Sequence, residues 1–268
     1  MLSVVIACAL VASGCVAPQA EPLDRADNPP AGEPVAPGWA PLDLATIRPG
    51  TPLALPGGAS CPTNFLFARP DNGTLFLGTT AHCLRDYTVG AVFSIGAPEN
   101  IAVVIYHSYQ TMAELGESDR AALENNDFAV VMIDSSSRDQ VNPTPLVGGG
   151  PTGLADGAGF VTGHQVVTRA ATPEQPDWRD GVITSTIGDW ALLVHHAPPI
   201  LPGGMGGAVL TPQGEAVGHV ISLVAAPEAG ANAVARLDTV MAYAAEHANL
   251  DMSLVPWSYE ASAPVSGP

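Results

Sequence analysis

Positive charge is scarce in this 268-residue sequence, which has nine basic residues against 26 acidic ones and contains no lysine. A formal net charge of −17 gives a surface that repels phosphate backbones, and this argues against nucleic-acid binding. We interpret the acidity as a means of staying soluble outside the cell. It does not by itself predict a site for cationic partners.

Charged residues of both signs make up only 13% of the chain, whereas 47% of its residues are hydrophobic. This balance excludes a largely disordered protein. Long helices are disfavoured as well, because 26 prolines and 28 glycines require many turns and extended segments. At this length we expect one compact unit with a substantial core, flanked by tails.

The amino-terminal apolar run, residues 2–12, is too short to span a bilayer but has the length of a signal-peptide core. It ends in Ala12-Ser13-Gly14-Cys15, which resembles a bacterial lipobox, in which the cysteine becomes the lipid-modified first residue after cleavage. The resemblance implies that residues 1–15 form a leader with a lipobox and that the protein is an exported lipoprotein. Its only membrane contact would be the lipid anchor at Cys15. Ordinary secretion, with Cys15 lost or incidental, is the alternative.

Cysteine is also rare. Of the four cysteines, Cys8 and Cys15 fall in the leader, which leaves Cys61 and Cys83 in the body of the protein. Two cysteines in an exported chain predict one disulfide, which chain-entropy arguments value at about 3 kcal/mol. A free thiol pair and metal ligation are the alternatives, but no CxxC or histidine spacing supports them, and we expect neither a metal nor a cofactor.

The segment 16–56 is rich in proline, alanine and acidic residues and lacks hydrophobic periodicity, which predicts an extended linker. The folded body is expected over 57–250. Short strand-like runs separated by turns predict an all-β sandwich or barrel there. The clearest pair, 64–69 and 74–79, is joined by a turn that contains Asn72-Gly73, a strong hairpin signal.

Two helical stretches interrupt the strand pattern. Residues 111–123 are predicted to form a surface insertion. Asp238 is predicted to cap a final helix over 238–250, because the apolar residues Val240, Met241 and Ala244 fall on one helical face. Residues 251–268 are expected to form a flexible tail.

Two motifs in the body resemble one enzyme family. Thr79-Thr80-Ala81-His82-Cys83 resembles the T-A-x-H-C signature around the catalytic histidine of the chymotrypsin/trypsin family of serine peptidases. Farther along, Asn126-Asp127-Phe128-Ala129-Val130-Val131 resembles the segment that supplies the aspartate of that family. The resemblance implies that His82 is a general base and that Asp127 orients it, since a buried carboxylate fixes the tautomer of an imidazole and stabilises its charged form.

The same resemblance implies a fold. We expect a chymotrypsin-like double β-barrel with a C-terminal helix, the first barrel over about 57–140 and the second over about 141–237. In this family the cysteine beside the histidine bonds an upstream strand, and that role is implied for Cys61 with Cys83.

The third element of the family pattern is altered. Gly203-Gly204-Met205-Gly206-Gly207-Ala208-Val209 resembles G-D-S-G-G-P-V, which places Met205 at the nucleophile and Gly204 at the preceding aspartate. No serine, threonine or cysteine lies between Trp190 and Leu210, so shifting the alignment does not restore a nucleophile. A thioether cannot be deprotonated, and losing the serine of such a triad typically costs on the order of 10⁶ in turnover.

The altered turn retains its backbone donors. The resemblance implies an oxyanion hole formed by the N–H groups of Gly203 and Met205, with the Met205 side chain projecting into the cleft beside His82. In this family the primary specificity position lies six residues before the nucleophile, which corresponds roughly to Pro199 here. The resemblance therefore implies no buried acid that would recognise arginine or lysine. Our leading hypothesis is a catalytically inactive, monomeric relative that binds a protein or peptide ligand in the cleft between the barrels.

Two other functions remain open. The first is an active extracellular serine endopeptidase, in which a serine from elsewhere in the chain reaches His82. The other alternative is a β-barrel that binds a metal through some of its seven histidines, among them His195, His196 and His219, although no HxxH or HExxH spacing supports such a site.

Overall fold

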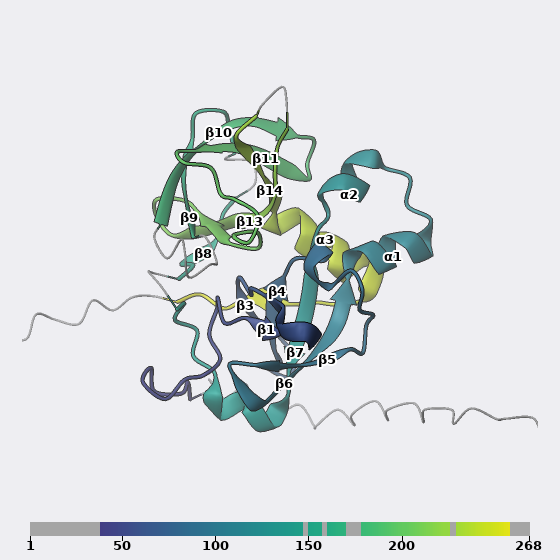
Figure 1. Ribbon diagram of the computed structural model, residues 1–268, viewed down its shortest axis with the longest axis vertical. Helices are drawn as coiled ribbons and strands as arrows, with labels where there is room; N and C mark the ends of the chain where they lie inside the picture. Colours follow the sequence, from purple (N-terminus) through teal and green to yellow (C-terminus); the bar gives the residue numbers. More distant parts are fainter. Residues whose placement is uncertain (1–37, 147–149, 157–159, 170–177, 226–228, 258–268) are drawn as a thin grey trace, which may run out of the picture.

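The computed structural model describes residues 38–146, 150–156, 160–169, 178–225 and 229–257. These residues form two lobes, each built around a β-sheet (Figure 1). The predicted leader with Cys15, and the first part of the predicted linker, lie outside the described residues. None of the helices in the described ranges is long and apolar enough to cross a membrane.

The first lobe contains an eight-stranded sheet in the order β15-β3-β4-β7-β6-β5-β1-β2. Its strands are β1 (Leu53–Ala54), β2 (Ser60–Cys61), β3 (Leu66–Ala68), β4 (Leu75–Thr79), β5 (Val92–Ile95), β6 (Ala97–His107), β7 (Ala129–Ile133) and β15 (Ser253–Leu254). The helices of this lobe are η1 (Pro56–Gly58), η2 (His82–Leu84), α1 (Ser108–Leu115), α2 (Arg120–Asn125) and η3 (Ser135–Gln140).

The second lobe contains a seven-stranded sheet in the order β12-β9-β10-β11-β14-β13-β8, and an additional pairing of β12 with β13 closes six of these strands into a barrel. Its strands are β8 (Gly153–Leu154), β9 (Gln165–Arg169), β10 (Trp178–Ile187), β11 (Ala191–His196), β12 (Ala208–Leu210), β13 (Glu215–Leu223) and β14 (Ala231–Arg236). Helix α3 (Leu237–Ala248) follows β14 and runs beside α1 and α2 (Figure 1). The predicted all-β double barrel with a C-terminal helix is therefore confirmed.

The predicted hairpin forms between β3 and β4, which pair antiparallel with Phe67 opposite Phe76. Its turn depends on Asn72, whose side-chain oxygen accepts hydrogen bonds from the amide and the hydroxyl of Thr74. Gly73 adopts a φ of 67°, which a residue without a Cβ adopts at little cost. The local turn chemistry thus sets the register of the strand that leads to His82.

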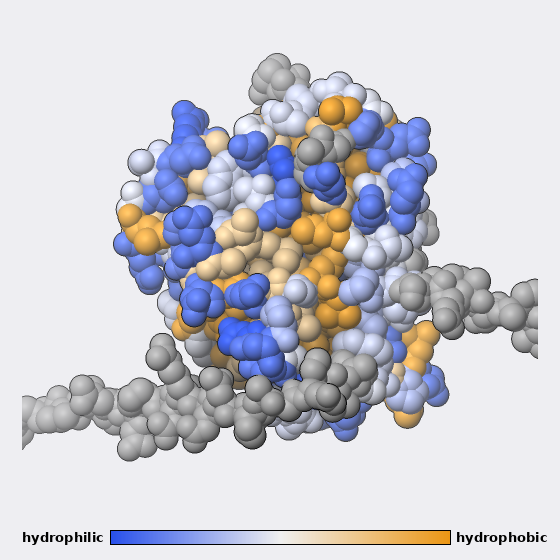
Figure 2. Space-filling model, turned by 180° about the vertical axis from the view of Figure 1, so that it is seen from behind, coloured by the Kyte–Doolittle hydropathy of each residue, from blue (hydrophilic) through white to orange (hydrophobic). Residues whose placement is uncertain are grey.

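The two lobes share an aromatic-rich core. Phe67, Phe76 and Phe128 of the first lobe pack in one buried cluster with Ile221 of the second lobe and Val240 of α3. Burying each such large side chain contributes on the order of 2 kcal/mol, so the cluster fixes the lobes relative to each other. On the face shown in Figure 2, apolar side chains gather toward the middle and hydrophilic ones surround them.

The predicted helical insertion is two helices. The chain leaves α1 at Gly116, whose left-handed φ of 67° ends the helix. Asp119 then caps α2 by accepting a hydrogen bond from the amide of Ala121. The prediction of one continuous helical stretch over 111–123 missed this break.

The predicted cap of the final helix is wrong. Helix α3 begins at Leu237, and Arg236 occupies the N-cap position without a side-chain hydrogen bond of the capping type. Asp238 lies inside the first turn, where its carboxylate accepts from the guanidinium of Arg236 at 2.6 Å and from the amide of Thr239. An acidic residue there is favourable because the helix dipole is positive at its N-terminus.

The predicted linker over 16–56 ends earlier than expected. From residue 38 onward the chain packs on the first lobe, with Ala40 and Ile47 buried and Ile47 bridging Val141. Leu53 lies in β1, which pairs with both β2 and β5. A few apolar residues are enough to bury a segment whose overall composition is typical of a linker.

The predicted flexible tail over 251–268 is wrong for its first part. Residues 253 and 254 form β15, which pairs antiparallel with β3, and Met252 is buried in the cluster between the lobes. Residues 258–268 lie outside the described part of the chain.

Candidate functional site

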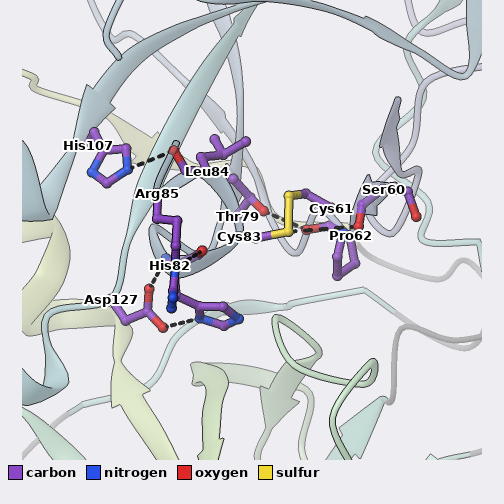
Figure 3. The surroundings of a disulfide bond; sticks show 10 residues. All are labelled: Ser60, Cys61, Pro62, Thr79, His82, Cys83, Leu84, Arg85, His107 and Asp127. Atoms are coloured by element: carbon purple, nitrogen blue, oxygen red, sulfur yellow. Dashed lines mark hydrogen bonds and ion pairs between the residues drawn. A yellow bond between two sulfur atoms is a disulfide. The ribbon is translucent and has the colours of Figure 1, made fainter. Parts of the chain in front are cut away.

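A disulfide between Cys61 and Cys83 joins β2 to η2, with the two Cα atoms 5.8 Å apart (Figure 3). The predicted cross-link is thereby confirmed. A second tie lies beside it, because the hydroxyl of Thr79 donates to the main-chain oxygen of Pro62 at 2.7 Å. Both contacts hold the short helix that carries His82 against the preceding strands.

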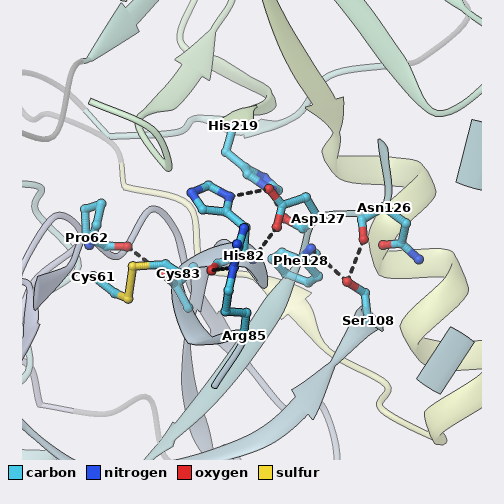
Figure 4. Close-up of polar contacts among 11 residues, drawn as sticks. Cys61, Pro62, His82, Cys83, Arg85, Ser108, Asn126, Asp127, Phe128 and His219 are labelled. Atoms are coloured by element: carbon cyan, nitrogen blue, oxygen red, sulfur yellow. Dashed lines mark hydrogen bonds and ion pairs between the residues drawn. A yellow bond between two sulfur atoms is a disulfide. The ribbon is translucent and has the colours of Figure 1, made fainter. Parts of the chain in front are cut away.

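Asp127 accepts two hydrogen bonds from His82. The His82 amide donates to Oδ1 at 2.7 Å, and the ring Nδ1 lies 2.5 Å from Oδ2 (Figure 4). The Asp127 side chain is 4% exposed and that of His82 is 29% exposed. Because a carboxylate only accepts, Nδ1 carries the proton, and Nε2 is the ring nitrogen left to act on a ligand.

The backbone on either side of Asp127 is held by a buried serine. The Ser108 hydroxyl donates to the main-chain oxygen of Asn126 at 2.6 Å and accepts from the amide of Phe128 at 3.1 Å (Figure 4). Ser108 is fully buried at the start of α1. The helical insertion therefore contributes to the position of the carboxylate.

Two further side chains of the same region face Asp127 or η2. The pKa of the Tyr109 hydroxyl is raised by burial and by the nearby Asp127 carboxylate, which disfavours a second negative charge. The His107 ring donates through Nε2 to the main-chain oxygen of Leu84 in η2 at 3.3 Å, and burial lowers the pKa of this histidine. Both side chains lie near enough to the buried Asp127 carboxylate to interact with its charge.

His219 reaches the site from the second lobe. Its Nε2 donates to the main-chain oxygen of Asp127 at 2.8 Å, and its ring is fully buried against Phe128. Burial lowers the pKa of His219, so the imidazole is neutral with Nδ1 unprotonated. Nδ1 has no hydrogen-bond partner among the described residues.

Two of the three histidines considered as metal ligands, His196 and His219, make hydrogen bonds to other groups of the protein. In the second lobe, His196 contacts Thr168 through Nε2 at 2.7 Å and Asn232 through Nδ1 at 2.9 Å. The described ranges contain no group of three or more histidine, cysteine or acidic side chains that could hold a metal ion. The alternative of a metal site at His195, His196 and His219 has no arrangement to support it there.

The glycine-rich turn packs against the first lobe beside Pro62 and Thr80, and Thr80 lies two residues before His82 in the sequence. A Cβ on Gly206, which has a φ of 88°, would lie 3.1 Å from the Pro62 ring and 3.6 Å from the Thr80 side chain. A Cβ on Gly207 would lie 2.1 Å from the main-chain oxygen of Arg169, a clash that no side chain could accommodate. The turn thus requires glycine at both positions in order to lie where it does.

Hydrogen bonds to β13 fix the same turn. The amide of Gly206 donates to the main-chain oxygen of Val220 at 2.7 Å, and the amide of Val220 donates to the main-chain oxygen of Gly207 at 3.0 Å. In contrast, the N–H groups of Gly203 and Met205 make no hydrogen bond within the described part of the chain. These two donors are the ones that the sequence assigns to an oxyanion hole.

The Met205 side chain is half-buried and packs against the apolar cluster of the second lobe, which includes Ile200 and Val220. Within the described ranges, no hydroxyl group makes a hydrogen bond to His82. The expected projection of Met205 toward His82 stays a prediction.

The loop before the turn is held by Asn232, a residue that the sequence did not point to. The side-chain amide of Asn232 accepts from the Ile200 amide and donates to the Ile200 oxygen, both at 2.9 Å, and also donates to the Ser222 oxygen at 3.3 Å. It joins the loop that contains Pro199 to the end of β13. No sequence motif marks an asparagine for this role, because all of these partners are main-chain groups.

Comparisons with known proteins agree with the fold. A family model described as a trypsin-like peptidase domain matches residues 67–218. A glutamic-acid-specific serine protease, reported to use a histidine triad in substrate binding, is similar with a TM-score of 0.51 at 15% identity, over 78% of this chain and 100% of that chain. A Nocardiopsis protease also gives a TM-score of 0.51, at 18% identity over 78% and 99% of the two chains. No curated protein matches this sequence.

Proposed function

Because the chain belongs to the trypsin-like peptidase domain family, we propose that it is an exported, lipid-anchored member that binds a protein or peptide in its cleft without hydrolysing it. The observation that carries this proposal is Met205 at the position of the nucleophile, in a turn that otherwise keeps its glycines. Hydrolysis by this family's chemistry needs a hydroxyl that a base can deprotonate, and a thioether has no proton to give.

The rest of the site supports retention of ligand binding. The His82 ring nitrogen Nε2 and the N–H groups of Gly203 and Met205 are polar groups without a partner in the described residues. Ser222 and Leu223 are exposed at the end of β13, where an extended peptide can pair with the strand. These groups orient a bound peptide even where no acyl intermediate forms.

The test is covalent labelling with a broad serine-directed phosphonate, together with a peptide-hydrolysis assay. We expect no labelling and no hydrolysis by the natural chain. We expect Met205→Ser to become labelled, because it places a hydroxyl in a turn that lies near the His82–Asp127 pair. The matched control is Met205→Ser combined with His82→Ala, in which labelling is lost again.

An active endopeptidase is the second candidate, and the intact hydrogen bond between His82 and Asp127 favours it. Stoichiometric labelling of the natural chain, mapped by mass spectrometry to a serine, would establish this candidate and end the proposal of an inactive site. Labelling that requires Met205→Ser supports the proposal.

Export and anchoring are tested separately from the cleft. Radiolabelled palmitate should enter the natural chain in a bacterial host and should not enter Cys15→Ser. A secreted, unlabelled natural chain would show that the anchor is wrong while leaving the proposal for the cleft intact.

A further inference from the structure

A hollow of about 490 Å³ opens at one end of the second barrel. Its walls are the residues next to β8, the turn between β12 and β13, and the start of β9 with the loop before it. Buried apolar residues form its floor, namely Ala155, Val166, Ile183 and Val217. This volume lies in the range of pockets that hold a side chain or a small ligand.

The rim of this hollow is polar and acidic. Asp156 and Glu215 bring two carboxylates to it, and His164, Gln165 and Gln213 add groups that form hydrogen bonds. The described residues of the lining include no arginine. An apolar floor with a few polar groups at the mouth is the usual make-up of a recognition pocket.

A second hollow of about 420 Å³ adjoins the first and shares Gln165, Val166 and Pro212 with it. Its lining includes a third carboxylate, Asp180, and no arginine among the residues that the structure describes. We refer to the two hollows together as the barrel-end groove. The combined volume of the two hollows exceeds what a single side chain fills, which favours an extended ligand.

Three exposed apolar side chains belong to the lining of the barrel-end groove or adjoin a lining residue in the sequence. Leu154 is 41% exposed beside Ala155, Val161 is 51% exposed beside Phe160, and Val182 is 40% exposed within the second lining. Large apolar side chains that gather at the surface around a hollow mark interaction sites more often than isolated ones do. Such side chains suit a polypeptide partner better than a small polar molecule.

The groove is separate from the cleft. Neither lining includes His82, Asp127 or a residue of the glycine-rich turn. The turn precedes the first residue of β12, whereas the groove begins at Thr211, beyond the last one. At about 3.3 Å per residue, this strand places the two sites roughly 10 Å or more apart.

We propose that the barrel-end groove is a second binding site, which takes an extended peptide segment that carries an apolar side chain next to a lysine or arginine. The apolar side chain enters the hollow over Val166 and Ile183, and the cationic group pairs with Glu215 and Asp156 at the rim. Strand β8 ends the sheet and, among the described residues, pairs only with β13, and a peptide strand that adds to its other edge would extend the sheet. The inference does not depend on whether the cleft hydrolyses peptides.

The test titrates the isotopically labelled protein with three capped pentapeptides and follows amide shifts by NMR. Their cores are lysine-leucine-lysine, glutamate-leucine-glutamate and lysine-serine-lysine. We expect the first to bind at least tenfold more tightly than either of the others, with shifts centred on Gly163, Thr211, Gln213 and Val217. Equal affinity for the leucine and serine cores, or shifts spread over both lobes, would overturn the proposal.

Substitutions distinguish binding in the groove from the general attraction of a cationic peptide to an acidic protein. Asp156→Asn with Glu215→Gln should weaken the lysine-leucine-lysine peptide at least fivefold, as should Gln213→Trp at the mouth. The matched control, Asp86→Asn with Glu99→Gln, removes two exposed carboxylates from the first lobe and should change the affinity less than twofold. His82→Ala should leave binding intact, and loss of binding there would place the peptide in the cleft and refute the inference.

Discussion

The ring of His219 in the second lobe donates a hydrogen bond to the main-chain oxygen of Asp127 in the first lobe at 2.8 Å. His219 also lies opposite Ala208, the residue that follows the glycine-rich turn, in the pairing of β12 with β13. One buried residue therefore connects the backbone of Asp127 to the strand that follows the turn with Met205.

Replacing His219 by alanine should destabilise the fold by about 3 kcal/mol. The substitution leaves a cavity in a fully buried place and removes the partner of the Asp127 oxygen. Urea unfolding followed by tryptophan fluorescence measures the loss. A change below about 1 kcal/mol would mean that the contact between the lobes does not depend on this ring.

Acid should destabilise the protein through its buried histidines. Burial lowers the pKa of His107, His196 and His219 in the folded chain, so below about pH 6.5 the unfolded chain binds protons that the folded chain does not. Stability should therefore fall as the pH drops from about 6.5 to 5, by up to about 1.4 kcal/mol per pH unit for each histidine.

The His219→Gln variant tests the cause of this pH dependence. A glutamine side chain can still donate to the Asp127 oxygen but does not titrate. The variant should show a shallower loss of stability between pH 6.5 and 5 than the natural chain. Urea titrations at several pH values measure how the stability of each chain changes with pH. An equal change for the two chains would show that His219 titrates alike in the folded and unfolded states.

Arg169→Met should leave stability unchanged or raise it by up to about 1 kcal/mol. The guanidinium of Arg169 lies against Gly50 and forms no ion pair among the described residues, and burial together with Arg48 lowers its pKa to about 10. A buried cation without a carboxylate partner costs more in desolvation than it returns.

Arg236→Met is the matched control for Arg169→Met. Arg236 is also mostly buried, but it pairs with Asp238 at 2.6 Å. Removing it should destabilise the fold by about 1 to 3 kcal/mol, since it leaves a half-buried carboxylate unpaired. If thermal unfolding shows a similar loss of stability for both variants, Arg169 has a partner that stabilises the fold as much as Asp238 does through Arg236.

Breaking the disulfide should cost about 3 kcal/mol. The bond between Cys61 and Cys83 closes a loop with a sequence separation of 22, and the cross-link restricts the unfolded chain. A chain with both cysteines replaced by serine should unfold at lower urea concentration. Equal midpoints for the two chains would mean that the hairpin alone sets the position of η2.

The sequence predicted those parts of the site that are written in local motifs. The residues around His82 and Asp127 form recognisable segments, and the structure brings the two side chains into contact. The Asn72-Gly73 turn likewise predicted the hairpin before it. Such features depend on residue types at fixed spacing, which a sequence displays directly.

Contacts to main-chain atoms were beyond what the sequence could predict. His219 binds an oxygen 92 residues away, and Asn232 holds Ile200 through its amide and oxygen, so no side-chain pair is visible to suggest either contact. The linker prediction failed for a related reason. Its proline-rich composition concealed Ile47 and Leu53, whose burial depends on surfaces supplied by distant strands.

The pairing of β15 with β3 has a consequence for how the chain folds. Ser253 and Leu254 complete the edge of the first lobe, yet they are synthesised after the whole second lobe. The sheet of the first lobe is therefore complete only after nearly all of the described residues have been synthesised, so the first lobe cannot finish folding before the second lobe has been made. Removing residues 249–257 would leave β3, the first strand of the hairpin that leads to His82, without its partner at the sheet edge.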